Sequence, residues 1–436
     1  MTLVARLRQT VAKALPIGLG MVMLFAGQVV LARLVGAAVF GSYGYMLTWV
    51  TIAALLAKAG HDFAVMKTLP VLRRNREYGR ISFLLRRTAK VVTLDALWMA
   101  LALVGAALVA TWLGRVTLSP TTYMVGVALL FVLAWSALRR ATMLSAGMTW
   151  ASEGPENMVK PALICGFVWL LIIVGGEPTP ERVLALTLAA TGIVLVLASV
   201  VAYLSVPAAL RRIAPEPFDL ADVKSVAKSM RLTNLVAVVL RNSDILIVGS
   251  MVSAAATGIY IAASRVAAIA GVIVTILDPV ASPRVSAAYA EGNRRELRAI
   301  ALEYSAISSA GSLTFVLAMV IGGDFILGLF GTQFTQGTAI ALVLLLGHLT
   351  NALTGPSGVF LSMTGGEKIS FRVSFWAAAF YLLLLAILVP LMSAMGAAIA
   401  FAISTATKNV VQCFFVWRRT GINTTLLPIA TASRPD

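Results

Sequence analysis

The stretch AAVFGSY at residues 37–43 returns in degenerate form as AAATGIY at residues 254–260, an offset of about half the 436-residue chain. Each copy joins one long apolar segment to the next through a turn of small residues, and each ends in glycine and tyrosine: Gly41 and Tyr43, then Gly258 and Tyr260. If each half contains an even number of spans, both halves enter the bilayer in the same direction, related by an axis along the membrane normal. The repeat therefore predicts a duplicated membrane protein with two lobes.

Composition excludes the soluble classes. The chain is 59% apolar and 12% charged, with a mean hydropathy of +0.91, whereas soluble domains average about 45–50% apolar and about 25% charged residues. The first apolar stretch, 14–32, is too long for the core of a signal peptide and is expected to remain as a spanning helix. Cys165 and Cys413 both lie in apolar runs, so neither a disulfide framework nor a metal or cofactor site is expected.

Apolar runs long enough to cross about 30 Å of hydrocarbon occur twelve times, and they are continuous rather than alternating, which indicates helices rather than strands. The predicted fold is an all-α polytopic membrane protein of two six-helix bundles. Its spans are 12–33, 45–66, 91–113, 121–138, 158–175, 183–206, 232–252, 256–282, 302–322, 335–355, 370–391 and 394–417.

The spans group into two lobes with connecting segments. We expect an N-terminal lobe at 1–210, a C-terminal lobe at 232–417 and a cytoplasmic tail at 418–436. The linker at 211–231 begins a helix near Asp219 and Asp222, which is suited to lie on the membrane surface.

Basic residues set the orientation. The chain has 35 lysines and arginines. Of those that lie outside the spans, all fall on the side that holds both termini except Arg33, Arg115 and Arg182. By the positive-inside rule we expect both termini to be cytoplasmic. The net charge of +17 is thus explained by loops that face anionic lipid, and no nucleic-acid partner is expected. The densest basic loop, 67–90, is also suited to hold a phosphate-bearing lipid or partner.

Four basic residues lie at bilayer depth: Lys58, Arg241, Arg265 and Lys408. Each costs about 2.5–3.5 kcal/mol at a helix centre, so we expect them to face a wet interior rather than lipid. Together with Asn234, which shares a helical face with Arg241, they are the predicted substrate pathway.

Each of these residues also has a purely structural interpretation. Arg241 is three residues from Asp244 and Lys58 is four residues from Asp62, so each can form an intrahelical ion pair. Lys408 follows Ser404 and precedes Gln412 on one polar face, but its side chain can also reach toward the cytoplasm. Arg265 has no carboxylate three or four residues away, so its charge must be met from another helix, from water or from substrate.

Transport driven by an ion gradient requires a group whose charge or occupancy changes. Asp244, Asp278 and His348 are the candidates, although an isolated histidine in a membrane is more often a structural polar group. The coupling ion cannot be named from these residues. Nucleotide-binding and metalloprotease motifs are absent from the sequence, and no outer loop is large enough for an active site, so we do not expect an enzyme.

The chain resembles the Wzx-type oligosaccharide flippases, which belong to the superfamily of multidrug, oligosaccharidyl-lipid and polysaccharide exporters. The resemblance rests on LARLVGAAVFGSYGY at 31–45, RNSDILIVGSMVSAAATGIYIAASR at 241–265, LFGTQF at 329–334 and GPSGVFLSMTGGEK at 355–368. These patterns are diffuse and identify the superfamily better than the substrate.

The resemblance implies a flippase that moves a polyprenyl-diphosphate-linked oligosaccharide from the inner to the outer leaflet by alternating access through a cationic central cavity, for the assembly of a surface polysaccharide. The implied partners are this lipid-linked substrate, membrane lipids, and polysaccharide polymerase and co-polymerase proteins, with a monomer as the transport unit. The alternative is an ion-coupled antiporter for drugs or other small molecules. Span 1 carries no carboxylate, which disfavours export of organic cations.

Overall fold

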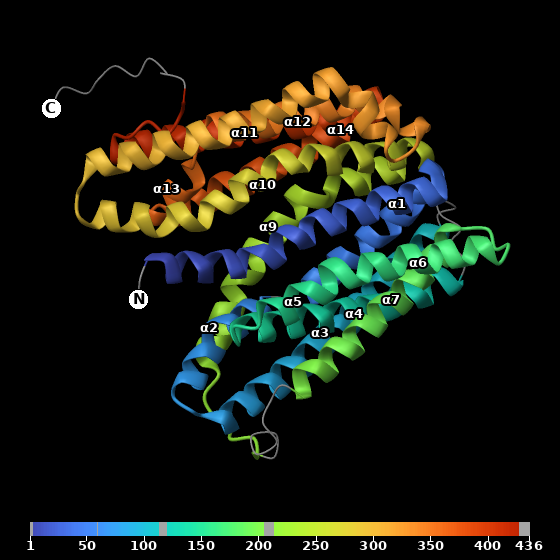
Figure 1. Ribbon diagram of the computed structural model, residues 1–436, viewed down its shortest axis with the longest axis horizontal. Helices are drawn as coiled ribbons and strands as arrows, with labels where there is room; N and C mark the ends of the chain where they lie inside the picture. The colour runs from blue at the N-terminus through green and yellow to red at the C-terminus, as the bar shows by residue number, and fades with distance from the viewer. Residues whose placement is uncertain (1–2, 59, 113–119, 205–212, 427–436) are drawn as a thin grey trace. The chain divides into compact units, whose positions relative to one another are not determined.

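The computed structural model describes residues 3–58, 60–112, 120–204 and 213–426, and all regular structure in these ranges is helical (Figure 1). The chain divides into two compact units, Met1–Val238 and Val239–Asp436. The first unit contains α1 (Leu3–Lys58), α2 (His61–Arg74), α3 (Tyr78–Trp112), α4 (Pro120–Ser145), α5 (Thr149–Gly154), the π-helix η1 (Pro155–Val159), α6 (Lys160–Ile173) and α7 (Pro180–Leu204). Helix α9 (Ala221–Met251) crosses from the first unit into the second.

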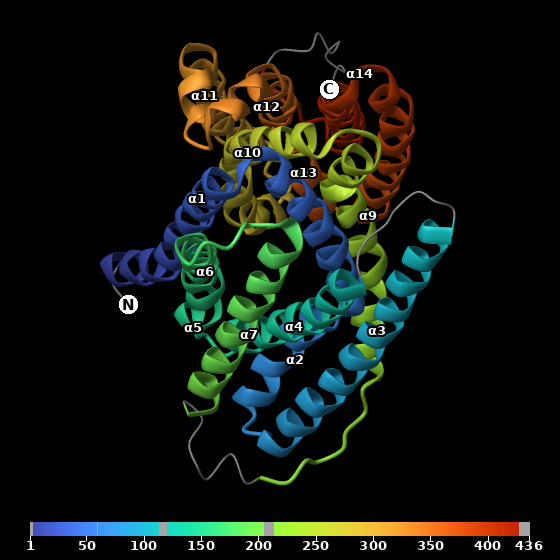
Figure 2. The same ribbon diagram turned by 90° about the vertical axis from the view of Figure 1, so that its right-hand side faces the viewer.

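The second unit continues with α10 (Ala254–Ala290), α11 (Arg294–Gly328), the 3-10 helix η2 (Thr332–Gly337), α12 (Thr338–Leu353), α13 (Ser357–Met363) and α14 (Glu367–Thr420). Helix α10 packs against α11, α12 and α13, and α12 packs against α14 (Figure 2).

The helices agree with the twelve predicted spans. Within the described ranges, nine helical segments are long and apolar enough to cross a membrane. Two of them, in α1 and α14, are double spans, because Gly36 (φ 79°) and Ser393 (φ 53°) interrupt the helical backbone. Helix α9 supplies the remaining span and is less apolar, because Arg241, Asn242 and Asp244 interrupt it.

The two copies of the repeat occupy matching places in their units. AAVFGSY follows the kink at Gly36, and AAATGIY follows Ser253, whose hydroxyl accepts a hydrogen bond from the amide of Ala256 at the start of α10. Both repeat tyrosines are buried. The Tyr43 hydroxyl lies 3.0 Å from Thr187 Oγ1, and the Tyr260 hydroxyl donates to Asp244 Oδ2 over 2.7 Å.

The predicted second span, 45–66, is wrong in its second part. Helix α1 ends at Lys58, and Gly60 adopts a left-handed backbone (φ 81°) before α2 begins. A Cβ at this position would lie 2.6 Å from the carbonyl oxygen of Ala227 and 2.9 Å from Met230 Cβ. Glycine is required here for two reasons, the left-handed backbone and the close approach of α9. Hydropathy along the sequence indicates neither of them.

The start of α9 packs onto the first unit. Asp219 Oδ1 accepts a hydrogen bond from the amide of Ala221 over 2.9 Å, as expected for a helix start. Val223 and Ala227 are buried with Ala64, Leu72 and Leu84 of α2 and α3. The apolar face of this linker helix is therefore covered by protein. Residues 211–212 of the predicted linker and 427–436 of the predicted tail lie outside the described part of the chain.

A second correction concerns the segment between the predicted fourth and fifth spans. Helix α4 continues to Ser145, and α5, η1 and α6 follow one another without interruption from Thr149. Arg139 and Glu156, expected in a cytoplasmic loop, are instead buried, with side chains 6% and 3% exposed, and their closest atoms are 3.3 Å apart.

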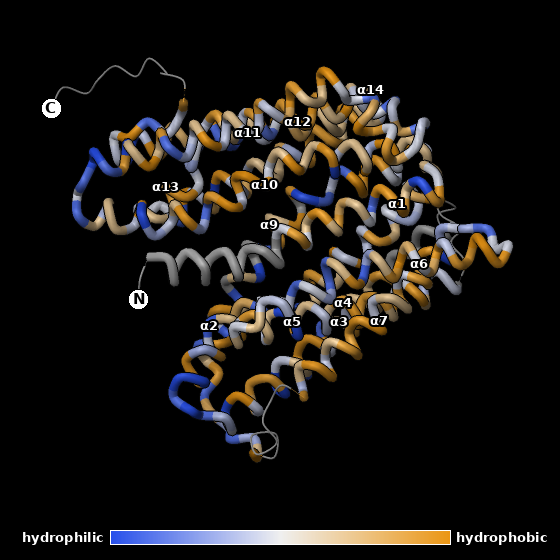
Figure 3. The backbone as a smooth tube through the Cα atoms, viewed as in Figure 1, coloured by the Kyte–Doolittle hydropathy of each residue, from blue (hydrophilic) through white to orange (hydrophobic). Residues whose placement is uncertain are grey.

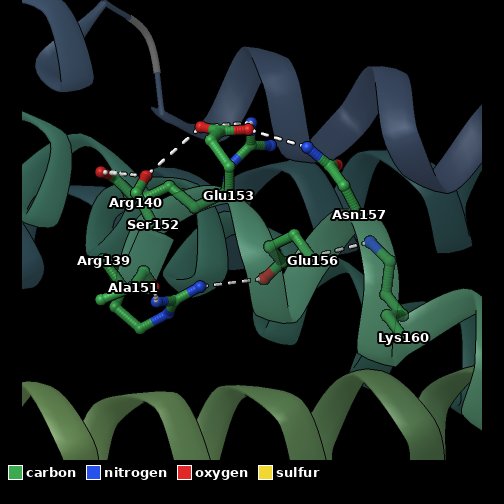
Figure 4. A network of polar contacts seen from close by, with 8 residues as sticks. All are labelled: Arg139, Arg140, Ala151, Ser152, Glu153, Glu156, Asn157 and Lys160. Atoms are coloured by element: carbon green, nitrogen blue, oxygen red, sulfur yellow. Dashed lines mark hydrogen bonds and ion pairs between the residues drawn. The ribbon is translucent and has the colours of Figure 1, made fainter. Parts of the chain in front are cut away.

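These residues form a ladder of charges between α4 and the π-helix (Figure 4). Glu156 Oε2 also accepts from Lys160 Nζ over 2.9 Å. A parallel group joins Arg140 to Glu153 over 2.9 Å, and Asn157 donates to the same carboxylate over 2.9 Å. The two arginines of α4 thus pair with two carboxylates that lie about one turn apart on the facing helical segment. Breaking such a buried pair leaves a charge without its partner.

The end of α14 is followed by a short segment that packs back onto the second unit. Ser305 of α11 donates to the carbonyl of Thr424 over 2.7 Å, and the amide of Leu426 donates to the carbonyl of Leu353 over 3.0 Å. Gly355 (φ 68°) allows this approach, because a Cβ there would lie 2.2 Å from the Thr424 carbonyl oxygen.

Replacing Gly60 by alanine is expected to destabilise the protein more than the same change at Gly147. Both glycines are left-handed, at φ 81° and φ 80°, but nothing lies within 4 Å of a Cβ at Gly147. Gly147→Ala should cost about 1 kcal/mol from backbone strain alone, and Gly60→Ala should cost about 1–3 kcal/mol more from overpacking. Thermal unfolding of both variants in detergent measures this difference, and equal transition temperatures would contradict the assigned packing.

Neutralising Glu156 is expected to destabilise the first unit strongly, because Arg139 would remain buried without its carboxylate. Removing one partner of a buried pair costs about 3–5 kcal/mol, so Glu156→Gln should lower the unfolding temperature clearly. The double variant Arg139→Gln/Glu156→Gln should recover part of the loss. A double variant no more stable than Glu156→Gln would show that the two side chains are not energetically coupled.

Candidate functional site

Helices of the second unit bring together several of the intramembrane polar residues predicted from the sequence. Asp278 of α10 accepts a hydrogen bond from the hydroxyl of Tyr304 of α11. Lys408 of α14 is close enough to Asp278 for their opposite charges to attract each other. Ser282, on the predicted polar face of α10, donates to the backbone carbonyl of Asp278 over 2.7 Å rather than to its carboxylate.

Lys408 is also close enough to Arg241 of α9 for the two positive charges to repel each other. The Arg241 side chain is exposed and that of Lys408 is half-buried. In the described part of the chain neither forms an ion pair within 4.0 Å. Lys408 thus has one nearby carboxylate, that of Asp278, against the two positive charges of Arg241 and Lys408 itself. The positive charge at this place therefore exceeds the negative charge that the neighbouring side chains supply.

Asp244 does not pair with Arg241, so the structural alternative given for that arginine is wrong. Asp244 is buried, and its Oδ2 atom instead accepts from Tyr260 of α10 over 2.7 Å. The positive charge that acts on Asp244 is that of Arg265, one helix away. Arg265, which has no carboxylate at helical spacing, thus meets an opposite charge on α9, and another helix was one of the three sources that the sequence allowed, beside water and substrate.

His348 occupies a packed position on α12. Its ring centroid lies 5.1 Å from that of Phe401 of α14. On the side of α10, a Cβ at Gly271 would lie 3.1 Å from His348 Nδ1. The charge of Lys408 also reaches this ring. His348 therefore packs between Gly271 of α10 and Phe401 of α14.

Two members of the predicted pathway belong to the first unit. Lys58 Nζ lies 2.5 Å from Asp62 Oδ2, which confirms the predicted pair, but Lys58 ends α1 and Asp62 lies in α2, so the pair is not within one helix. Asn234 lies on α9 two turns before Arg241, and its Nδ2 atom is buried without a hydrogen-bond partner in the described residues. Of the five predicted residues, Lys58 and Asn234 thus belong to the first unit, and Arg241, Arg265 and Lys408 belong to the second.

Sequence reasoning missed the tyrosines that hold the carboxylates. Tyr260 was visible as the last residue of the repeat, but nothing in its spacing indicated that it would reach Asp244 of the preceding helix. Tyr304 lies 26 residues from Asp278, on a separate helix, and no sequence pattern indicates that the two side chains meet. The acidic partners of Arg139 and Arg140 were missed for a different reason, since the charges themselves made the segment resemble a loop.

The arrangement of the second unit is suited to hold an anion. Arg241 and Lys408 place a guanidinium and an ammonium group near each other, and phosphate oxygens are the groups that such donors bind well. Among the described residues, no three histidine, cysteine or acidic side chains are placed to hold a metal ion.

Comparisons with known proteins agree with this architecture. Residues 179–339 match the family model described as polysaccharide biosynthesis protein. A search of curated proteins finds no match. An inward-facing multidrug-resistance MATE-family transporter of the MOP superfamily is similar in structure, with a TM-score of 0.73 and 11% identity over 92% of this chain and 94% of the other.

Two further structures show the same fold. The lipid II flippase MurJ, in an inward closed conformation, has a TM-score of 0.70 and 11% identity over 93% of this chain and 87% of its own. A MOP superfamily transporter from Pyrococcus furiosus, whose binding pocket is described as having reverse polarity, has a TM-score of 0.57 and 13% identity over 92% and 95%. The resemblance drawn from the sequence is confirmed at this level: the chain is a multi-pass membrane protein with the fold of the MOP superfamily, which includes transporters and flippases.

Proposed function

We propose that this protein is a flippase that moves a polyprenyl-diphosphate-linked oligosaccharide from the inner to the outer leaflet of a bacterial cytoplasmic membrane. The single observation that carries the proposal is the excess positive charge at bilayer depth in the second unit, at Arg241 and Lys408. A charge kept in this environment is costly unless water or an opposite charge meets it. The diphosphate of a lipid-linked glycan supplies such a charge.

The substrate's chemistry fits this division of polar and apolar surface. Its diphosphate and sugars need a hydrated, cationic passage, while its polyprenyl chain stays in the hydrocarbon. Arg241, Arg265 and Lys408 supply the field for the head group, and Asp244 restrains Arg265. Helix α9, which carries Arg241, lies within the residues that match the polysaccharide biosynthesis model, and this supports glycan transport over other cargo.

The transport cycle that we propose is alternating access, with the head-group passage open to one side of the membrane at a time. The transport unit is a monomer with both termini in the cytoplasm, and polymerase and co-polymerase proteins receive the product at the outer face. Surface polysaccharide assembly is the process that this activity serves.

Ion-coupled antiport of small molecules is the second candidate, because Asp244 and Asp278 are carboxylates at bilayer depth in the second unit. Each accepts a hydrogen bond from a tyrosine, and a site for organic cations would require such carboxylates to be available. The nearby Arg265 and Lys408 work against binding a cation, which places this function second.

Complementation of a bacterial strain that lacks a known oligosaccharide flippase tests the proposal. Arg241→Ala and Lys408→Ala should each abolish rescue or reduce it by about tenfold or more, because a lost charge-assisted contact costs about 1.5–3 kcal/mol. Arg241→Lys should retain much of the activity. Arg298→Ala, an exposed change on α11, is the matched control and should rescue like the parent, with protein amounts in the membrane compared by immunoblot.

Equal rescue by the parent and both alanine variants would remove these residues from the passage. Failure of the parent, combined with increased drug resistance that Asp278→Asn abolishes, would instead favour the antiporter.

A further inference from the structure

The first unit carries an exposed group of basic residues that the proposed transport does not use. Lys67, Arg73, Arg74 and Arg76 are exposed at the end of α2 and in the turn to α3, and Arg86, Arg87 and Lys90 are exposed on α3 itself. Figure 3 shows hydrophilic residues concentrated at this turn.

Where acidic side chains occur in this region, they are already used. Arg80 lies 2.8 Å from Glu77 Oε2 and 3.3 Å from Glu216 Oε1. In contrast, no ion pair or hydrogen bond within the described residues satisfies the side chains of Arg86, Arg87 and Lys90. These three cations lie close together on one helix, and an anion from outside the protein could bind to them.

The same helical face changes from basic to apolar along α3. Leu94, Leu97, Trp98 and Leu101 follow Lys90 at helical spacing and are 48%, 49%, 67% and 55% exposed. With a rise of about 1.5 Å per residue, the distance from Lys90 to Leu101 is roughly 16 Å, close to the hydrocarbon depth of one leaflet. We name the seven residues from Arg86 to Leu101 on this face the α3 stripe.

We propose that the α3 stripe is a binding site for an anionic phospholipid, with its phosphate held by Arg86, Arg87 and Lys90 and one acyl chain lying along Leu94, Leu97, Trp98 and Leu101. The order of the groups on the helix matches the order of the groups in a lipid, with charge at the interface and an apolar chain below it. A bulk anionic phospholipid is the occupant because membranes present it continuously at this depth, and each lysine or arginine near an anionic surface adds about 1 kcal/mol of attraction. This proposal does not rest on the proposed function, because the α3 stripe uses none of the residues assigned to the glycan passage.

Trp98 provides a direct readout, because brominated acyl chains quench tryptophan fluorescence on contact. The protein is reconstituted in bilayers in which either phosphatidylglycerol or phosphatidylcholine carries brominated chains. The quenching that Trp98 contributes is the difference between the parent and Trp98→Phe. We expect brominated phosphatidylglycerol to be preferred over brominated phosphatidylcholine by about fivefold at Trp98. The exposed Trp376 of α14, isolated in the same way with Trp376→Phe, should show a preference near one.

Charge variants separate a specific site from a general effect. Arg86→Gln/Arg87→Gln/Lys90→Gln should reduce the preference at Trp98 to about one, whereas Arg86→Lys/Arg87→Lys should retain it. The matched control Arg294→Gln/Arg295→Gln/Arg298→Gln removes the same charge from exposed positions on α11 and should leave the preference at Trp98 unchanged.

Absence of a preference in the parent, or an equal loss in the α11 control, would overturn the proposal. Protection of Trp98 by polyprenyl phosphate but not by phosphatidylglycerol would also overturn it, because the stripe would then hold the carrier lipid of a transport substrate. Complementation by the α3 triple variant is measured in parallel. Normal rescue combined with a lost lipid preference separates this site from the proposed function.

Discussion

The cost of placing a charge in hydrocarbon governs the architecture of this protein. Every basic side chain at bilayer depth must meet a carboxylate, a polar group or water, and the two units satisfy this constraint differently. In the first unit the answer is internal: Lys58 pairs with Asp62, and Arg139 and Lys160 share Glu156. The Arg139–Glu156 pair joins α4 to the π-helix, and together the three pairs leave little charge at bilayer depth for a ligand.

In the second unit the compensation is incomplete. Asp244 compensates part of the charge of Arg265 and accepts a hydrogen bond from Tyr260. Asp278 compensates part of the charge of Lys408 and accepts a hydrogen bond from Tyr304. Arg241 and Lys408 repel each other and have no ion pair in the described residues. A fold that keeps two like charges near each other at bilayer depth loses stability by doing so, and the flippase that we propose would use them to bind the anionic head group of its substrate.

The sequence predicts the fold well because both of its main signals are long and redundant. Twenty-residue apolar runs define the spans, and the repeat ending in Tyr43 and Tyr260 marks the same place in each unit. The charge pattern also predicts the Lys58–Asp62 pair, because both partners lie one turn apart. Gly60 shows the limit: its left-handed turn depends on contact with Ala227, far along the chain, and hydropathy does not report such contacts.

The same limit explains the errors at the site. Local spacing favours Arg241 as the partner of Asp244, but a tyrosine on the next helix reaches the carboxylate first. Arg139 and Glu156 resemble loop residues in the sequence, because buried charges are rare. Only the packing of the two helical segments shows that the two charges neutralise each other. Pairing across helices is decided by helix rotation, and side-chain periodicity along a single helix does not determine it.

Water access to position 408 tests the central claim most directly. The two native cysteines, Cys165 and Cys413, are first replaced by alanine, and Lys408→Cys is then compared with Leu385→Cys, which places the thiol at a fully buried position on the same helix. A membrane-impermeant, charged thiol reagent should modify residue 408 and spare residue 385, and a polyprenyl-diphosphate-linked glycan should slow the modification at 408. If residue 408 resists the reagent as fully as residue 385 does, no hydrated passage reaches this charge, and the proposed route for the head group is contradicted.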